Sequence, residues 1–299
     1  MAQKKDSDYP VVRTLRVEAG TPTLNTELIK GEEFLSKANR RLYRQARNYT
    51  MKIDIDADSD VVYNVYALAR TWMNDRAMRM AYEMYLKNSE DERLTLKGQN
   101  LARWQDFKVL SGQSASEAKP VMYNGSTPVS LTAGEFIDTI VVDKDGVSKE
   151  FTWGASTASK YGLLDEYNKA GDAQASPDTT TGDMPYDDLM ADNSAVLANL
   201  LQTVGNTPPY DAANVGQSFP WVKVAALSAH TVAQKLSTGF FEAPCGFVLL
   251  KGDGVEALPM DRVSVTFKPG DYKGVHAPSM LDGVKGPDMF GRGIPWSKN

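Results

Sequence analysis

A block of basic residues near the start of the chain is the first feature whose residue types indicate a chemistry. Between Phe34 and Lys52 there are six basic residues and no acidic ones, and Tyr43 and Tyr49 are interleaved with them. Cationic side chains neutralise phosphates and aromatic rings stack on bases, so this composition is typical of a nucleic-acid contact. An ordinary basic surface helix has the same composition, and both interpretations stay open. The candidate contacts are Lys37, Arg40, Arg41, Arg44 and Arg47.

Alternating aspartates follow this block directly. Asp54, Asp56 and Asp58 place a carboxylate at every second position, as at the start of a calcium-binding loop. An EF-hand loop also needs a glycine and a later glutamate, and those positions hold Ser59 and Val65. A strand with a solvated acidic face is therefore the preferred interpretation. The three aspartates are the candidate ligands for a Ca²⁺ ion between subunits, and no other cofactor is expected.

The motifs of the common enzyme classes are missing from the sequence. There is no phosphate-binding loop, no dinucleotide-binding glycine pattern and no Gly-x-Ser-x-Gly motif. His230 and His276 lie beside turn-like sequence, and Cys245, the single cysteine, lies in an apolar run. We therefore expect that the chain is not an enzyme, although a hydrolase with a carboxylate pair formed only by folding stays an alternative. A single cysteine also predicts folding in a reducing compartment.

The overall composition of the 299 residues is that of a soluble globular protein, with 42% apolar residues and a net charge of −5. No apolar run approaches the ~18 residues of a membrane span, and the first residues do not resemble a secretory signal. Eight acidic residues lie between Asp165 and Asp192, against one basic residue, Lys169. The basic and acidic blocks predict opposite charge on two different surfaces.

The elements that must position these residues are mostly strands. Cys245–Lys251 and Arg262–Lys268 are strand-like runs separated by glycines, and we expect them to form the last hairpin of a β-sandwich. Apolar and polar residues alternate in the second run, which predicts a half-buried strand. The first run is almost entirely apolar at 246–250, which predicts a strand covered on both faces.

Further elements precede this hairpin. An apolar face at helical spacing predicts a helix within Val61–Ser89. The turn Asp143–Gly146 between Ile137–Val142 and Lys149–Trp153 predicts a second hairpin. The stretch Ala155–Tyr186 is rich in small and polar residues and is expected to be a long exposed insertion.

Two segments resemble the capsid proteins of small viruses with circular single-stranded DNA genomes and their relatives. The first, at 71–109, contains TWMNDRAMRMAYEMYLKNSEDE and ARWQDFKV. The second, at 240–281, contains FFEAPCGFVLLKGDG and VSVTFKPGDYKGVHAPSML. The resemblance implies a mainly β fold, an eight-stranded antiparallel jelly-roll sandwich with helical insertions in its loops and extended terminal arms. Many such proteins begin with a long arginine-rich arm, whereas only Lys4 and Lys5 precede Arg13 here.

The expected organisation and function follow from this resemblance. Residues 1–48 would be an N-terminal arm with the basic block, 49–282 a jelly-roll shell domain with helical and acidic loop insertions, and 283–299 a C-terminal arm. The implied function is a capsid protein that self-assembles from identical subunits into an icosahedral shell and packages a single-stranded nucleic-acid genome. It would be found in the virion and made in the host cytoplasm. A carbohydrate-binding or phage-tail receptor-binding β-sandwich is the alternative.

Overall fold

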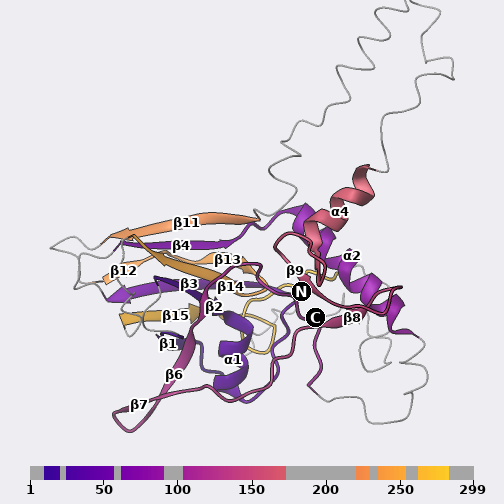
Figure 1. Cartoon of the computed structure of the whole chain (residues 1–299). Helices are drawn as coiled ribbons and strands as arrows, with labels where there is room; N and C mark the ends of the chain where they lie inside the picture. Colours follow the sequence, from indigo (N-terminus) through magenta and orange to yellow (C-terminus); the bar gives the residue numbers. More distant parts are fainter. Residues whose placement is uncertain are drawn as a thin grey trace, which may run out of the picture.

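Two β-sheets face each other across an apolar core and make up the main body of the protein (Figure 1). The computed structural model describes residues 10–20, 25–56, 62–90, 104–172, 220–228, 235–253 and 262–282. Within these residues the protein is mainly β, and helices lie around the sheets. The expected C-terminal arm, 283–299, lies outside the described residues.

The first sheet contains strands from both ends of the chain. Its order is β12 (Lys235–Ser237), β3 (Asn48–Asp56), β15 (Val263–Phe267), β1 (Thr14–Glu18), β6 (Lys119–Asn124) and β7 (Thr127–Ser130), and β13 (Phe241–Pro244) also pairs with β3. All of these pairs are antiparallel.

The second sheet has the order β11 (Trp221–Ser228), β4 (Val62–Leu68), β14 (Phe247–Gly252), β2 (Thr26–Lys30) and β5 (Ser116–Glu117). Only the short β2–β5 pair in it is parallel. A third, smaller sheet contains β8 (Ile140–Val142), β9 (Ser148–Thr152) and β10 (Lys160–Gly162). The predicted hairpin at Asp143–Gly146 is confirmed, because β8 and β9 pair antiparallel across it.

The alternation of side chains explains how the strands bury their apolar residues. Val263, Val265 and Phe267 of β15 point into the core between the sheets, which confirms the predicted half-buried strand. β14 is covered on both faces, as its apolar run predicts. Its Val248 and Leu250 belong to the core of the sandwich, while its Phe247 and Leu249 belong to a second apolar cluster outside the second sheet.

The expected last hairpin is wrong, because β14 and β15 do not pair with each other. β14 lies between β2 and β4 in the second sheet, and β15 lies between β1 and β3 in the first. Each strand therefore finds its partners far away in the sequence. Cys245 is not in a strand either: it has a left-handed φ of 58° in the turn before β14, where Gly246 N–H donates to Ala243.

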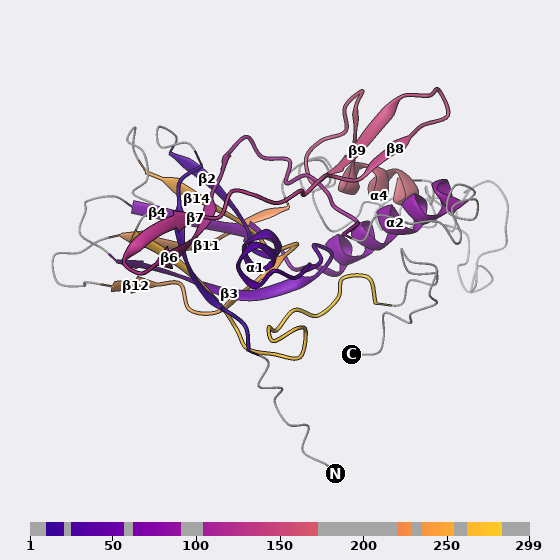
Figure 2. The same cartoon turned by 90° about the horizontal axis from the view of Figure 1, so that it is seen from below.

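Helices cover one end of the sandwich. α1 (Gly31–Asn39) connects β2 to β3 and packs against β6 and β2, and Figure 2 shows α2 (Trp72–Asn88) extending away from the sheets. The helix predicted within Val61–Ser89 begins only at Trp72, because Val62–Leu68 forms β4. In that strand Tyr63, Val65 and Ala67 alternate into the core, and this two-residue period overrides the helical spacing.

The connection from β4 to β11 is long and is integrated into both sheets. Its β5 adds to the second sheet and its β6 to the first, with only Ala118 between them, whose N–H donates to Leu28 O at 2.9 Å. The stretch expected as an exposed insertion, Ala155–Tyr186, is described as far as residue 172 and contains β10 and α4 (Leu163–Asp172). Leu163 and Leu164 are buried in the second apolar cluster, so this part of the stretch is packed against the fold. Residues 173–186 lie outside the described residues.

The stretch expected as an N-terminal arm, 1–48, supplies β1, β2 and α1 to the sandwich. Leu15 and Val17 of β1 and Ile29 of β2 are buried in the core. The described part of this stretch is therefore integral to the fold and not an arm.

Candidate nucleic-acid interface

The basic block lies in α1 and in the irregular segment that joins it to β3. Glu32 and Glu33 occupy the first turn of the helix and Lys37 its last turn, an arrangement that favours the helix dipole. The helix ends at Asn39, and Arg40 directly after it adopts a left-handed conformation. Hydrogen bonds from backbone N–H groups to side-chain oxygens hold the following segment. Tyr43 N–H donates to Ser36 Oγ at 2.8 Å, and Gln45 N–H donates to a carboxylate oxygen of Asp106 at 2.8 Å.

Two of the five predicted contacts are engaged inside the protein. Arg47 is buried, donates to Ala277 O at 2.7 Å, and stacks its guanidinium 3.4 Å from the centre of the Tyr272 ring. Arg44 forms an ion pair with Asp106 at 3.3 Å, and the Arg44 side chain is only 17% exposed. Burial raises the pKa of Asp106, and the positive charge of Arg44 opposes this rise. Both arginines therefore hold the segment to its neighbours.

Lys37 is also largely engaged within the fold. Its ammonium lies 3.3 Å from a carboxylate oxygen of Glu33 and 5.1 Å from the centre of the Phe136 ring, and its side chain is 13% exposed. The exposed members of the predicted set are Arg40 and Arg41. The structure thus divides the five residues into three that serve packing and two that face the solvent.

Lys273 joins the two exposed arginines, although sequence reasoning did not single it out. Its ammonium donates to Leu42 O, and its carbonyl accepts a hydrogen bond of 2.9 Å from the Tyr43 hydroxyl. Burial, together with the nearby charges of Arg41 and the two engaged arginines, lowers the pKa of Lys273 to about 8. Lys273 lies more than two hundred residues from the basic block in the sequence, so no local pattern links them. The positive surface therefore includes a residue from the segment after β15.

Two of the three expected metal ligands, Asp54 and Asp56, form separate ion pairs. Asp54 is buried in β3 and forms an ion pair of 2.8 Å with Lys52, while Asp56 pairs with Arg16 at 2.6 Å. Burial raises the pKa of Asp54, but hydrogen bonds from Lys52 and Ser237 outweigh that effect and lower it. Asp58 lies outside the described residues. Among the described residues no cluster of three or more acidic, histidine or cysteine side chains could hold a metal ion.

Cys245 and the described histidine, His276, are both held by contacts within the fold. The Cys245 thiol is fully buried, and burial raises its pKa strongly, so the reactive thiolate is disfavoured. The Nδ1 atom of His276 lies 2.9 Å from the hydroxyl of Thr50 and joins the segment after β15 to β3. His230 lies outside the described residues.

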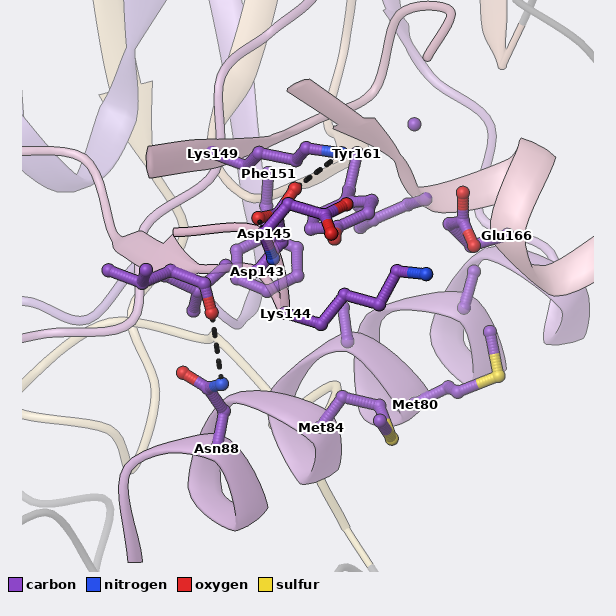
Figure 3. Close-up of a pocket in the computed structure, with 16 residues that line it drawn as sticks. Met80, Met84, Asn88, Asp143, Lys144, Asp145, Lys149, Phe151, Tyr161 and Glu166 are labelled. Atoms are coloured by element: carbon purple, nitrogen blue, oxygen red, sulfur yellow. Dashed lines mark hydrogen bonds and ion pairs between the residues drawn. The ribbon is translucent and has the colours of Figure 1, made fainter. Parts of the chain in front are cut away.

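A cavity of about 610 Å³ lies between α2, the β8–β9 hairpin and α4 (Figure 3). Apolar side chains such as Met80, Met84 and Phe151 line it, and Lys144 extends across it in the view of Figure 3. An ion pair of 3.2 Å between Lys149 and Asp143 braces one wall. Cavities of this size accept small apolar ligands. None of the predicted site residues lines it, so it is separate from the basic surface.

A comparison of the chain with protein-family models, curated proteins and solved structures finds no significant match. The described residues contain no helix that is both long and apolar enough to cross a membrane.

Proposed function

We propose that this chain is a jelly-roll capsid protein whose identical subunits self-assemble into an icosahedral shell around a single-stranded nucleic-acid genome. In this proposal the protein has no enzymatic activity. It is part of the virion and is made in the cytoplasm of the host cell.

The strand order is the observation that carries the proposal. β12 and β13 both pair with β3 and together take one place in the first sheet. With these two counted as one, and apart from the long connection between β4 and β11, the main strands alternate between the two sheets along the chain. The last two strands, β14 and β15, pair with the first two, β2 and β1. This nested order fits the two Greek keys of a jelly roll, an architecture used by viral capsids and also by lectins.

Exposed apolar side chains on the outer strands favour assembly over a monomeric binding module. On the β6–β7 hairpin, Tyr123 is 57% exposed and Val129 is 45% exposed. At the far edge of the second sheet, Val222 of β11 is 47% exposed. Edge strands with exposed apolar residues readily pair with other chains, so contacts between subunits would cover them.

Self-assembly is tested with the purified full-length protein by negative-stain microscopy and sedimentation. We expect closed particles or large oligomers. A stable monomer at high concentration would contradict the proposal, and specific binding of that monomer on a glycan array would instead support the carbohydrate-binding alternative.

Packaging is tested by reversing the exposed charges of the basic surface. We expect the double variant Arg40→Glu/Arg41→Glu to form particles with less packaged nucleic acid, because neither side chain is buried in the fold. The matched control is Lys223→Glu/Lys251→Glu, which makes the same charge change at exposed positions of the second sheet. The absorbance ratio at 260 and 280 nm of purified particles measures the content. Equal nucleic-acid content in both variants would refute the role of Arg40 and Arg41.

A further inference from the structure

The cavity between α2, the β8–β9 hairpin and α4 leaves apolar side chains open to solvent (Figure 3). Met84 is 55% exposed and Val142 is 52% exposed, and both line it. Asn88 Nδ2 donates to Val142 O at 3.2 Å and joins α2 to β8, while the rings of Phe151 and Tyr161, 6.2 Å apart, join β9 to β10. The walls of the cavity are therefore held to each other. Covering the cavity would remove apolar surface from water.

The cavity shares its wall with the apolar cluster in which the described chain ends. Residues that belong both to the cavity lining and to the second apolar cluster are Ala77, Ala81, Val141, Phe151 and Leu163. Met280 and Leu281 belong to the same cluster. Arg79 Nε donates to Met280 O at 2.9 Å, and the next residue of α2, Met80, lines the cavity. The chain thus leaves the described fold against the helix that forms one wall of the cavity.

Residues 283–299, which follow directly, have a composition that complements the cavity. Their large apolar residues are Met289, Phe290, Ile294 and Trp296. Their charged residues are three bases, Lys285, Arg292 and Lys298, and one acid, Asp288, a net charge of +2. The charged residues of the cavity lining are three acids, Asp143, Asp145 and Glu166, and two bases, Lys144 and Lys149, a net charge of −1. Apolar residues and opposite charges are therefore present on both sides.

The segment is long enough to reach the cavity. An extended chain covers about 3.3–3.6 Å per residue, and a helix with its side chains is about 10–12 Å across. Passing from the side of α2 that carries Arg79 to the side that carries Met80 therefore needs only the first few residues after Asp282. Attachment to the same chain also keeps the segment at a high effective concentration. Residues 173–219, in contrast, contain six acids and no base, and the negative lining would repel them.

We propose that residues 283–299 pass around α2 and bind in the cavity of their own chain. Phe290 and Trp296 supply the apolar contacts to the lining, and the basic residues of the segment lie at its acidic side. This inference does not rest on the capsid function, since it concerns a cavity and a segment that self-assembly and packaging do not require.

The first experiment measures how fast a cysteine in the cavity reacts with a thiol reagent in the full-length protein. Met84→Cys supplies the cysteine, and the native Cys245 does not react because it is fully buried. We expect Phe290→Ser/Trp296→Ser to raise the labelling rate severalfold, since the weakened segment no longer covers position 84. The control Val129→Cys places the cysteine on β7, at the end of the first sheet, and its rate should not change with the same two substitutions. Equal rates at position 84 with and without them would overturn the inference, as would an equal rise at both positions.

The charge complementarity is tested with the same cysteine at position 84. Lys285→Glu/Arg292→Glu should raise the labelling rate severalfold, because the acidic lining then repels the segment. The matched control Lys251→Glu/Lys268→Glu makes the same charge change at exposed positions of the two sheets and should leave the rate unchanged. The same rate in both variants would contradict the charge contacts of the proposed site.

Disulfide formation identifies the chain to which the bound segment belongs. In dilute protein with Met84→Cys, a second cysteine replaces Met289, Phe290 or Ile294 in turn, so that several registers are covered. We expect at least one pair to form a disulfide within one chain, detected as a monomer on a non-reducing gel and located by mass spectrometry. Disulfides only between chains would assign the cavity to the segment of a second copy and overturn the inference. The absence of any disulfide would also overturn it.

Residues 91–103 follow α2 and carry Leu94 and Leu96, so they are the other segment of this chain to test. Leu94→Ser/Leu96→Ser should leave labelling at position 84 unchanged. Faster labelling in this variant and not in Phe290→Ser/Trp296→Ser would assign the cavity to 91–103 and overturn the inference. None of these measurements requires particles. Their failure therefore leaves the capsid proposal intact, and a protein that forms no particles leaves this inference intact.

Discussion

At the scale of single residues, Glu32 presents the sharpest conflict between charge and environment. Its side chain is fully buried in the first turn of α1, where one carboxylate oxygen accepts a hydrogen bond of 3.2 Å from Gln45. The other oxygen has no hydrogen-bond partner among the described residues. Burial raises the pKa of Glu32 to about 7, although the charge of Lys108 opposes this rise. The folded protein therefore holds a proton here that the unfolded chain releases at lower pH.

This proton makes stability depend on pH in a defined direction. The folded state binds more protons than the unfolded state between about pH 4.5 and about pH 7, so the stability from Glu32 is fully present below this window and is lost as the pH rises through it. The loss is up to about 3 kcal/mol. We expect Glu32→Gln to remove this dependence and to be the more stable protein at about pH 8. Chemical denaturation of both proteins across this range measures the difference.

Glu33, the neighbouring carboxylate, provides a control for which the expected change in stability has the opposite direction. Glu33 lies 3.5 Å from Lys30, 3.3 Å from Lys37 and 3.6 Å from Lys108. Glu33→Gln leaves these lysines without their shared partner and should destabilise the protein at about pH 8, where Glu32→Gln stabilises it. If both substitutions changed the free energy of unfolding in the same direction at about pH 8, the environments assigned to Glu32 and Glu33 would be wrong.

At the scale of elements, α2 supports both the second apolar cluster and the cavity. Met78, Tyr82 and Tyr85 pack into the cluster, while Met80 and Met84 face the cavity. The helix begins after Thr71, whose hydroxyl oxygen accepts a hydrogen bond of 3.2 Å from Asn74 N–H. This cap satisfies one of the backbone donors that the first turn leaves unpaired.

Removal of the cap should destabilise α2 by a predictable amount. We expect Thr71→Ala to lower the free energy of unfolding by about 1 kcal/mol, while Thr71→Ser keeps the oxygen and stays within a few tenths of the wild type. Urea denaturation followed by circular dichroism tests this. If the alanine and serine variants are equally stable, the hydroxyl does not act as the cap.

The sequence predicts these elements where the signal is local and fails where partners are distant. Alternation in Val263–Phe267 and the turn at Asp143–Gly146 are properties of neighbouring residues, and both predictions hold. The pairing of β14 and β15 depends on strands from the other end of the chain, so the expected hairpin is wrong. The candidate site shows the same limit. The composition of the basic block shows its charge. It does not show that Asp106 pairs with Arg44 or that Tyr272 stacks on Arg47. It also does not show that Lys273 lies near enough to Arg41 to feel its charge.

At the scale of the whole molecule, the β6–β7 hairpin extends the first sheet and projects from the sandwich (Figure 1). Its outer strand, β7, is at the end of the sheet and carries the exposed Val129. If a neighbouring subunit covers this edge, a charge placed there opposes assembly and leaves the fold intact. We expect Val129→Lys to shift the protein from particles to small species in sedimentation.

The control is a valine with the same exposure elsewhere. Val147 in the β8–β9 turn is 45% exposed, as is Val129. Val147→Lys should assemble like the wild type. Normal particles from Val129→Lys would show that β7 is not an assembly edge, and failure of both variants would point to a general effect of charge.

The nested strand order also determines when the two sheets can be completed during synthesis of the chain. β15 is the last described strand, yet it lies between β1 and β3, and β14 likewise separates β2 from β4. Until these strands leave the ribosome, both sheets have a gap at their centre and the core lacks Val248, Leu250, Val263 and Val265. An incomplete chain therefore cannot present the finished surfaces of the sandwich. If the protein self-assembles as proposed, this order would exclude unfinished chains from the assembly, because they lack the strands that complete both sheets.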